Sequence, residues 1–353
     1  MKSVLGDAFE LLKSDNEIVL ATILEQHGST PRTSGTQFVI KTDGTSIGTI
    51  GGGQVEADVI EAAAWVFTNR SSLFLSYEKS EQKMLPASEL KNGKLSILLE
   101  FVESSKKNIA LYEALDQALK NRTGVILTLN IKITGEDGTC RITPTLFSDD
   151  LNWLAGASLS QNIIDDLFTT TDYKFKPVFR TSDDITYWLQ AISPPSRLTL
   201  FGAGHVSRAT ARLAVSTEFQ TMVIDDRKDL LSIEYYDSSV NLKHLDSLEE
   251  VPQDLQFDEY DYIVIMTRSH TIDRKILGQV LRTKAKYVGM LGSRRKREAA
   301  FKKLTSLGYT QAELERVHSP IGIKIGAETP EEIAVSILAE LIQLRSGHGP
   351  EEV

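Results

Sequence analysis

Residues 197–226 constrain the fold of this chain more than any other part of its sequence. An apolar segment, 197–201, runs directly into the glycine pair Gly202 and Gly204, and a run of helix-forming residues follows it. A second apolar segment comes about twenty residues later and ends in Asp225. In this order of strand, glycines, helix, strand and acid, the glycines let the backbone approach a phosphate at a helix N-terminus. The sequence therefore predicts a βαβ unit within a Rossmann-like, doubly wound parallel sheet.

The same fingerprint predicts residues that face a ligand. Gly202, Gly204 and His205 are expected to line a phosphate subsite. Asp225 is placed to accept a ribose hydroxyl. Ser207 stands where Gly or Ala is usual, and it is small enough for close packing of the helix on the strand. The alternative is a Rossmann-like domain that serves only as a scaffold, because a fold does not name its ligand.

The composition limits the class of protein. A length of 353 residues suggests two or three domains, and the net charge of −9 argues against binding to nucleic acid or anionic membranes. Cys140 is the only cysteine, so the chain has neither an intramolecular disulfide nor a cysteine-rich metal site. The sequence shows no signal-peptide pattern and no apolar run long enough to span a bilayer. We therefore expect a cytoplasmic protein.

The pattern of apolar residues and turns predicts an α/β protein with three segments. Residues 1–150 form an N-terminal α+β domain, 151–196 a connecting region, and 197–348 the C-terminal Rossmann-like domain. In the N-terminal domain we expect strands at 17–24, 36–41, 46–50, 72–78, 94–103 and 123–133, and helices at 5–14, 55–69 and 107–120. In the C-terminal domain we expect strands at 197–201, 220–225, 261–267 and 286–291, and a helix that begins at a capping box, Thr329 with Glu332.

A second candidate site is the triple glycine, residues 51–53, which lies between a strand and a helix. Backbone N–H groups at such a helix end attract anionic or polar ligands, and Arg32 precedes the loop in the sequence. Gln54 and Glu56 belong to the same helix start. The alternative is a tight turn without a ligand.

Two further segments follow apolar strands in the C-terminal half. Arg268 and His270 come directly after one strand, which places them at the ligand-binding carboxyl edge of the sheet, and a guanidinium binds oxyanions with two hydrogen bonds. The alternative for His270 is local capping of the loop together with Asp273. Ser293 and Arg294 follow the next strand, with Ser293 as a helix N-cap, and ligand contact or simple solvation are equally open for them.

These motifs, taken in order, resemble those of the XdhC/CoxI family of xanthine dehydrogenase accessory proteins. The resemblance covers most of the chain. In the N-terminal half it rests on residues 28–32, 48–53 and Glu56. In the C-terminal half it rests on residues 201–206, 225–227, 267–273, 292–295 and 320–334. Each motif is modest alone, and the set is specific.

The resemblance implies a chaperone for the molybdenum cofactor, molybdopterin. Such a protein binds the cofactor, protects it while its terminal sulfido ligand is installed, and delivers it to a molybdenum hydroxylase. The implied partners are a xanthine dehydrogenase-type hydroxylase and a cysteine desulfurase, while nucleic acid and membranes are not expected and a homodimer stays open. The resemblance specifies neither the hydroxylase served nor the mononucleotide or dinucleotide form of the cofactor.

One position departs from the family. Cys is frequent directly after the triple glycine, and this chain has Gln54 there. A thiolate could bind molybdenum or relay sulfur, and an amide has no such chemistry. We therefore expect the cofactor to be held through phosphate and pterin contacts, and sulfur to come from a partner desulfurase.

The residues expected to bind the cofactor form two groups, with neither catalytic residues nor metal ligands assigned. They are Arg32, Gly51, Gly52, Gly53, Gln54 and Glu56 in the N-terminal domain, and Gly202, Gly204, His205, Asp225, Arg268, His270, Ser293 and Arg294 in the C-terminal domain. The alternative function is an NAD(P)-dependent oxidoreductase that uses the same Rossmann site. Asp225 would then favour NAD, because a carboxylate repels the 2′-phosphate of NADP. A third alternative is a structural adaptor for the hydroxylase.

Overall fold

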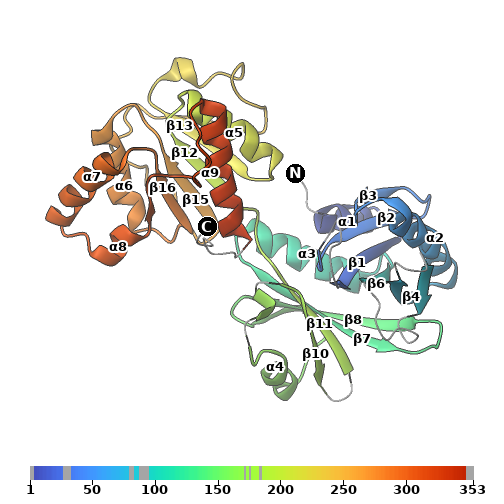
Figure 1. Cartoon of the computed structure of the whole chain (residues 1–353). Helices are drawn as coiled ribbons and strands as arrows, with labels where there is room; N and C mark the ends of the chain where they lie inside the picture. The colour runs from blue at the N-terminus through green and yellow to red at the C-terminus, as the bar shows by residue number, and fades with distance from the viewer. Residues whose placement is uncertain are drawn as a thin grey trace. The chain divides into compact units, whose positions relative to one another are not determined.

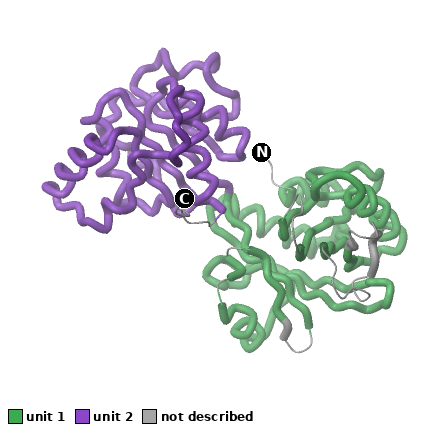
Figure 2. Tube along the Cα trace, viewed as in Figure 1, with its two compact units in different colours: residues 1–194 green, residues 195–353 purple. Residues whose placement is uncertain are grey.

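The chain folds into two compact units, Met1–Pro194 and Pro195–Val353 (Figure 2). The structure, a computed structural model, describes residues 4–26, 33–78, 83–86, 95–170, 172–174, 176–182 and 185–346. Within these ranges no helix is long and apolar enough to cross a membrane. Each unit contains hydrophobic clusters of its own.

The first unit is built on one antiparallel sheet, which has eleven strands in the described part of the chain (Figure 1). The strands are β1 (Ile18–Gln26), β2 (Gln37–Lys41), β3 (Ser46–Gly48), β4 (Ser72–Glu78), β5 (Lys83–Pro86), β6 (Leu95–Val102), β7 (Val125–Ile133), β8 (Thr139–Ser148), β9 (Trp153–Gly156), β10 (Val178–Ser182) and β11 (Ile185–Ile192). The main path runs β10-β11-β7-β8-β4-β6-β1-β2-β3, while β5 pairs with β4 and β9 with β8. The expected hairpin is confirmed, because β2 pairs with β3 across a turn in which Asp43 accepts a hydrogen bond from the Thr45 N–H at 2.9 Å.

Helices cover both faces of the central strands of this sheet. Helices α1 (Val4–Lys13) and α3 (Lys106–Lys120) pack on one face, and α2 (Gly53–Asn69) packs on the other. Alternate residues of β1 show the division: Leu20 belongs to the core under α1 and α3, while Val19 and Ala21 belong to the core under α2. Burial on both faces explains why β1 is apolar almost throughout.

Most of the segment 151–196, expected to connect two domains, belongs to the first unit instead, up to Pro194. It contains the short helix α4 (Gln161–Leu167) and strands β10 and β11, and β11 pairs with β7. Trp188 of β11 is fully buried, and its indole N–H donates to the Leu24 carbonyl at 3.2 Å. The first unit therefore ends at Pro194 and not near residue 150.

The second unit confirms the predicted doubly wound sheet. Its strands are β12 (Arg197–Phe201), β13 (Gln220–Asp225), β14 (Asn241–His244), β15 (Asp261–Ile265), β16 (Tyr287–Met290) and β17 (Val317–His318). They pair in parallel in the order β14-β13-β12-β15-β16-β17. The chain builds outward from β12 in both directions, so the order reverses there. Ligands of open α/β sheets bind at the carboxyl edge beside such a reversal.

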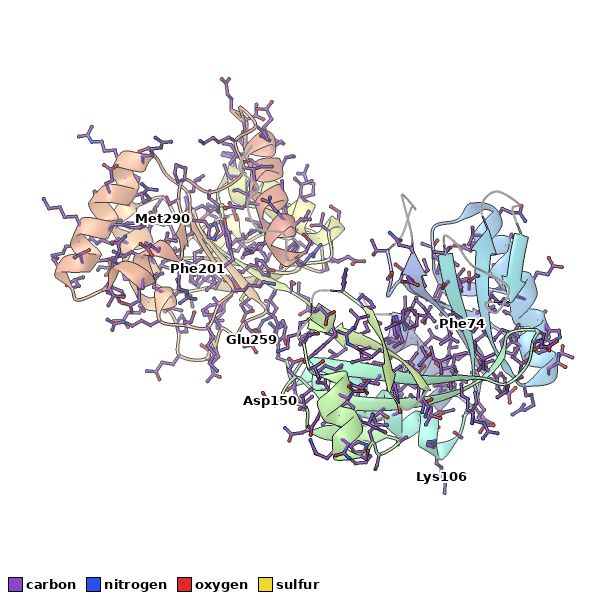
Figure 3. All side chains as sticks on the ribbon, turned by 60° about the horizontal axis from the view of Figure 1, so that its bottom comes forward. Phe74, Lys106, Asp150, Phe201, Glu259 and Met290 are labelled. Atoms are coloured by element: carbon purple, nitrogen blue, oxygen red, sulfur yellow. The ribbon has the colours of Figure 1, made fainter. Side chains whose placement is uncertain are left out.

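Helices lie on both faces of the parallel sheet (Figure 1). Helices α5 (His205–Ser216) and α9 (Pro330–Arg345) share one hydrophobic core with the sheet, and α6 (His270–Leu281), α7 (Arg294–Ser306) and α8 (Gln311–Glu315) share another. Leu200 faces the first core, and Phe201 faces the second. Phe201 and Met290, labelled in Figure 3, lie on strands between these helix layers.

Helix α9 is anchored at its start and in its middle. The expected capping box is confirmed: Thr329 accepts from the Glu332 N–H at 3.2 Å, and the Glu332 carboxylate accepts from the Thr329 N–H at 3.0 Å. Further along, Glu340 accepts from the Tyr287 hydroxyl at 2.8 Å and also contacts His318 Nδ1 at 2.6 Å. These contacts hold α9 to β16 and β17.

Candidate functional site

The glycine loop, residues 202–204, leaves the carboxyl end of β12 in the middle of the parallel sheet. Gly202 has φ +110°, and a Cβ there would lie 2.5 Å from the Met266 carbonyl oxygen, so only glycine fits. Gly204 is the N-cap of α5, and a Cβ there would meet no atom within 4 Å. Gly202 therefore makes the tight turn, and Gly204 leaves the backbone open to a ligand. Ser207, the expected third small residue, is fully buried.

Asp225, at the end of β13, holds the glycine loop. Its side chain is fully buried, and Oδ2 accepts from the Ala203 N–H at 2.6 Å. Arg227 donates to the same carboxylate from its backbone N–H at 2.8 Å, from Nε at 2.9 Å and from Nη2 at 2.8 Å. Burial by itself would raise the pKa of Asp225, but the hydrogen bonds from Arg227 and Ala203 outweigh it, and the pKa is lowered. The carboxylate is therefore charged and already bound within the chain. Its contact with a sugar hydroxyl stays a prediction.

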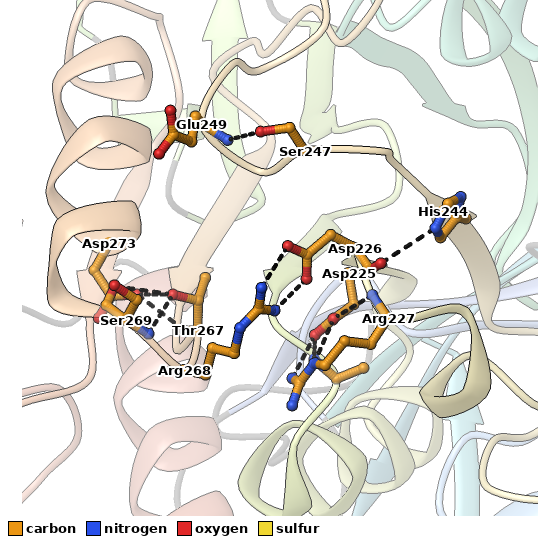
Figure 4. A network of polar contacts seen from close by, with 11 residues as sticks. Asp225, Asp226, Arg227, His244, Ser247, Glu249, Thr267, Arg268, Ser269 and Asp273 are labelled. Atoms are coloured by element: carbon orange, nitrogen blue, oxygen red, sulfur yellow. Dashed lines mark hydrogen bonds and ion pairs between the residues drawn. The ribbon is translucent and has the colours of Figure 1, made fainter.

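The neighbouring carboxylate, Asp226, pairs with Arg268, which follows β15. The guanidinium binds it with two hydrogen bonds, one from Nη1 and one from Nη2 at 2.8 Å (Figure 4). The side chain of Asp226 is 12% exposed and that of Arg268 is 47% exposed. Strands β13 and β15 flank β12, so this pair joins the two strands on either side of the glycine loop. Asp226 is a site residue that sequence analysis missed.

The loop that carries Arg268 is fixed by Asp273. This buried carboxylate accepts from the Thr267 N–H at 3.0 Å and from the Thr267 hydroxyl at 2.7 Å (Figure 4). Burial raises the pKa of Asp273, while the hydrogen bonds from Thr267 oppose the shift. His270 lies 3.8 Å from Asp273, and its side chain is 65% exposed. His205, in the first turn of α5, is also exposed. Both imidazoles therefore stand at the carboxyl edge and are open to solvent.

Three buried polar atoms lie close together beside the glycine loop. They are Ser207 Oγ and Arg208 Nε in the first turns of α5 and the Tyr236 hydroxyl in the segment after β13. Burial raises the pKa of Tyr236, while the charge of Arg208 and side-chain hydrogen bonds with Arg208 and Ser207 act in the opposite direction. These buried groups therefore interact with one another inside the second unit. Arg208 and Tyr236 were not predicted; the position of Arg208 directly after the fingerprint was the available signal.

The end of β16 contributes Ser293 and Arg294. Ser293 is the expected N-cap of α7 and accepts from the Lys296 N–H. Arg294 is exposed, whereas Arg297 donates to the Ser319 carbonyl at 2.8 Å. Arg294 therefore stays a candidate for ligand contact, and Arg297 has a structural role.

The triple-glycine loop belongs to the first unit, and its own carboxylate occupies part of it. Gly51, Gly52 and Gly53 all have positive φ, at 126°, 72° and 69°. Glu56 accepts from the Thr49 hydroxyl at 2.6 Å, from the Gly52 N–H at 3.1 Å and from the Ile50 N–H at 3.2 Å. The Thr49 hydroxyl and these N–H groups lower the pKa of Glu56 against the effect of burial. The loop therefore offers fewer donors to an anion than the sequence suggested.

Three further residues of the N-terminal half bear on sulfur chemistry and basic charge. Gln54 is exposed and donates from Nε2 to Asp58 at 2.5 Å. Cys140 is buried in β8, and burial, reinforced by Glu100, raises the pKa of its thiol to about 12. Arg32 lies outside the described residues. Within the described ranges, no group of three or more His, Cys, Asp or Glu side chains is arranged to hold a metal ion.

Comparison with known proteins gives the relatives of this chain. The XdhC and CoxI family matches residues 11–78, and the XdhC Rossmann domain matches residues 198–341. The chain is 30% identical over 342 residues to a probable xanthine dehydrogenase subunit of Bacillus subtilis, and the match covers 95% of each protein. It is 24% identical over 347 residues to the molybdenum cofactor insertion chaperone PaoD of Escherichia coli, which covers 98% of this chain and 88% of PaoD.

A solved structure confirms the fold over the full length. It is described as a xanthine dehydrogenase from Bacillus halodurans, and it matches with a TM-score of 0.74 and 23% identity, covering 99% of this chain and 98% of the other. At that identity the likeness shows the fold alone. The match to both family regions, together with 30% identity to a relative over nearly the whole length, shows that the chain belongs to the XdhC and CoxI family.

Proposed function

We propose that this protein binds the molybdenum cofactor as cargo and delivers it to a molybdenum hydroxylase of the xanthine dehydrogenase type. The observation that carries the proposal is the open backbone at Gly204, the N-cap of α5, with the exposed imidazole of His205 and the guanidinium of Arg268 at the same edge of the sheet. Molybdopterin carries a phosphate and a polar pterin, and this surface has groups for both. Membership of the family favours the molybdenum cofactor over other phosphate-bearing ligands. The relative PaoD is named for insertion of this cofactor.

The residues of the second unit divide the binding between them. Backbone N–H groups at the start of α5 bind the phosphate, because a helix N-terminus is electropositive. Arg268 supplies a guanidinium at the same edge of the sheet. Asp225 fixes the conformation of the glycine loop through the Ala203 N–H. His205 and His270 present exposed imidazoles that can contact the pterin. The protein thus binds and orients its cargo without forming a covalent bond to it.

The sulfur of the mature cofactor comes from a partner cysteine desulfurase in this proposal. Gln54 offers only an amide where the family often has a thiol. Cys140, the only cysteine, is buried, and its raised pKa keeps the thiol protonated at neutral pH. A protonated, inaccessible thiol does not act as a nucleophile. Replacing Cys140 by Ser is therefore expected to leave delivery of active cofactor unchanged.

The test is reconstitution of a cofactor-free hydroxylase with cofactor carried by this protein. The Gly204→Val variant should lose delivery at least tenfold, because a Cβ at this position meets no atom of the protein within 4 Å and the branched side chain projects into the space left for the ligand. Ala312→Val, at an exposed position in α8, is the matched control and should deliver normally. Normal delivery by Gly204→Val, with an unchanged unfolding midpoint, would reject the site.

The alternative function, an NAD(P)-dependent oxidoreductase, predicts that the isolated chain turns over a substrate, whereas a chaperone does not. Xanthine dehydrogenase activity needs iron–sulfur clusters, each held by several cysteines, and this chain has one cysteine. We therefore expect the isolated chain to oxidise neither xanthine nor other purines with added NAD. Steady turnover by the chain alone would favour the enzyme over the chaperone.

A further inference from the structure

The ion pair of Arg268 and Asp226, here called the bridging pair, lies where a ligand on the glycine loop would pass. Arg268 follows β15 and Asp226 follows β13, and β12 runs between these two strands. The glycine loop leaves β12 at the same edge. A side-chain contact between the outer two strands must therefore cross the carboxyl end of β12. Figure 4 shows the side chains of Arg268 and Asp226 facing each other.

The backbone on both sides of the bridging pair is fixed independently of the pair. The Asp226 carbonyl oxygen lies 3.3 Å from His244 Nε2, and Asp225 is held by Arg227 and Ala203. On the other side, Thr267 is bound by Asp273. Separating Arg268 from Asp226 thus requires rotation of side chains only. The 47% exposure of Arg268 leaves room for that rotation.

A diphosphate group competes with a carboxylate for a guanidinium. Both present two oxygen atoms at a spacing that suits the planar fork of Arg268, and the diphosphate carries more negative charge. It also gains N–H groups in the first turn of α5, which Asp226 does not contact; within the loop itself, the Gly202 N–H already donates to Ile224 and the Ala203 N–H to Asp225. We propose that a diphosphate-bearing ligand opens the bridging pair by taking Arg268 as its own partner, so that Asp226 acts as an intramolecular competitor of the ligand.

This inference rests on the proposed ligand site. It adds Asp226 to that site, names a diphosphate as the bound group, and predicts whether removal of Asp226 strengthens or weakens binding. A permanent structural clip is the contrasting view, in which Arg268 never leaves Asp226. The two views differ in sign. If Asp226 competes, its removal strengthens binding of a diphosphate; if the pair is a clip, removal of Asp226 changes nothing or loosens the loop and weakens binding.

The test measures the dissociation constant of inorganic diphosphate by isothermal titration calorimetry on the full chain. Asp226→Asn should bind about fivefold more tightly than the natural protein, since a partly exposed ion pair is worth up to about 1 kcal/mol. Arg268→Gln should bind at least fivefold more weakly. Asp254→Asn is the matched control, because it removes a carboxylate from the exposed ion pair with Lys243 and makes the same change in net charge. Its affinity should be unchanged.

The double variant Asp226→Asn with Arg268→Gln separates competition from simple charge repulsion. If Asp226 acts by occupying Arg268, the fivefold gain disappears once Arg268 is absent. If the gain persists in the double variant, Asp226 merely repels anions and the bridging pair is not exchanged. ADP should show the same gain as inorganic diphosphate, because the effect belongs to their common group; a gain for only one of them overturns the inference.

Failure of this inference is distinct from failure of the ligand site. Binding of diphosphate by the natural protein, with no gain in Asp226→Asn, leaves the site in place and overturns the competition. Absence of binding in every variant overturns both.

Discussion

Two adjacent carboxylates, Asp225 and Asp226, have different environments and different partners. Asp225 is buried and accepts four hydrogen bonds, one from the glycine loop and three from Arg227. Asp226 is partly exposed and bound to Arg268, which follows β15. Strand β12 lies between β13 and β15. One acid therefore supports the site, and the other faces it.

The contrast predicts unequal costs for the same substitution. Asp225→Asn should lower the free energy of unfolding by about 2–3 kcal/mol, because it places an amide against Arg227 in a buried network. Asp226→Asn should cost less than about 1 kcal/mol, because its ion pair is partly exposed. Urea unfolding followed by circular dichroism measures both.

Tryptophan fluorescence provides an internal control for that comparison. Trp65, Trp153 and Trp188 all lie in the first unit, so their signal reports that unit. The loss in Asp225→Asn should therefore be larger by circular dichroism than by fluorescence. Equal costs for the two substitutions would contradict the assignment of Asp225 as the support of the loop.

The sequence predicted the glycine loop correctly but not the roles of the two acids. Gly202 and Gly204 are recognisable because their spacing between a strand and a helix has a steric cause. No sequence pattern predicts that the Arg227 side chain donates to Asp225. This contact depends on the path of the chain after β13. The same applies to Glu56, which closes back on the triple-glycine loop from inside α2.

Helix α9 illustrates how one carboxylate joins several elements. Glu340 contacts Tyr287 of β16, His318 of β17 and the Gly322 N–H, the last at 2.5 Å. Burial by itself would raise the pKa of Glu340, but the contacts with His318, the Gly322 N–H and Tyr287 outweigh it, and the pKa is lowered.

This lowered pKa predicts a pH-dependent effect of Glu340→Gln. A carboxylate with a depressed pKa stabilises the fold above its unfolded pKa of about 4.3 and loses that contribution as the pH falls through the folded value. The variant should lose about 1–3 kcal/mol of unfolding free energy at pH 7 and less at pH 3.5. Urea unfolding at the two pH values checks this, and an equal loss at both would show that the charge of Glu340 is irrelevant.

Elements with a clear local pattern were predicted, whereas strands such as β8 and β11 were not. The α9 capping box at Thr329 and the hairpin turn at Asp43 are local and were found. Strand β11 was missed because its pairing with β7 joins segments about sixty residues apart in sequence, as Trp188 opposite Leu129 shows. The short edge strands β14 and β17 were missed because four and two residues carry too little periodicity.

The chain combines an antiparallel unit and a Rossmann-like unit, and the solved structure from Bacillus halodurans has the same fold. The fold and family followed from motifs spread over the sequence, whereas the boundary at Pro194 depended on tertiary contacts. The composition excluded an intramolecular disulfide and a cysteine-rich metal site, and the one cysteine, Cys140, is buried. The central claim is that the second unit carries the molybdenum cofactor.

The most direct measurement is to purify the protein from cells that make molybdenum cofactor and to identify the bound small molecule by mass spectrometry. We predict a molybdopterin species in the natural protein and in Ala312→Val, and its absence from Gly204→Val. A preparation from the same cells that contains NAD(H) instead, or no ligand in any of the three proteins, would contradict the account.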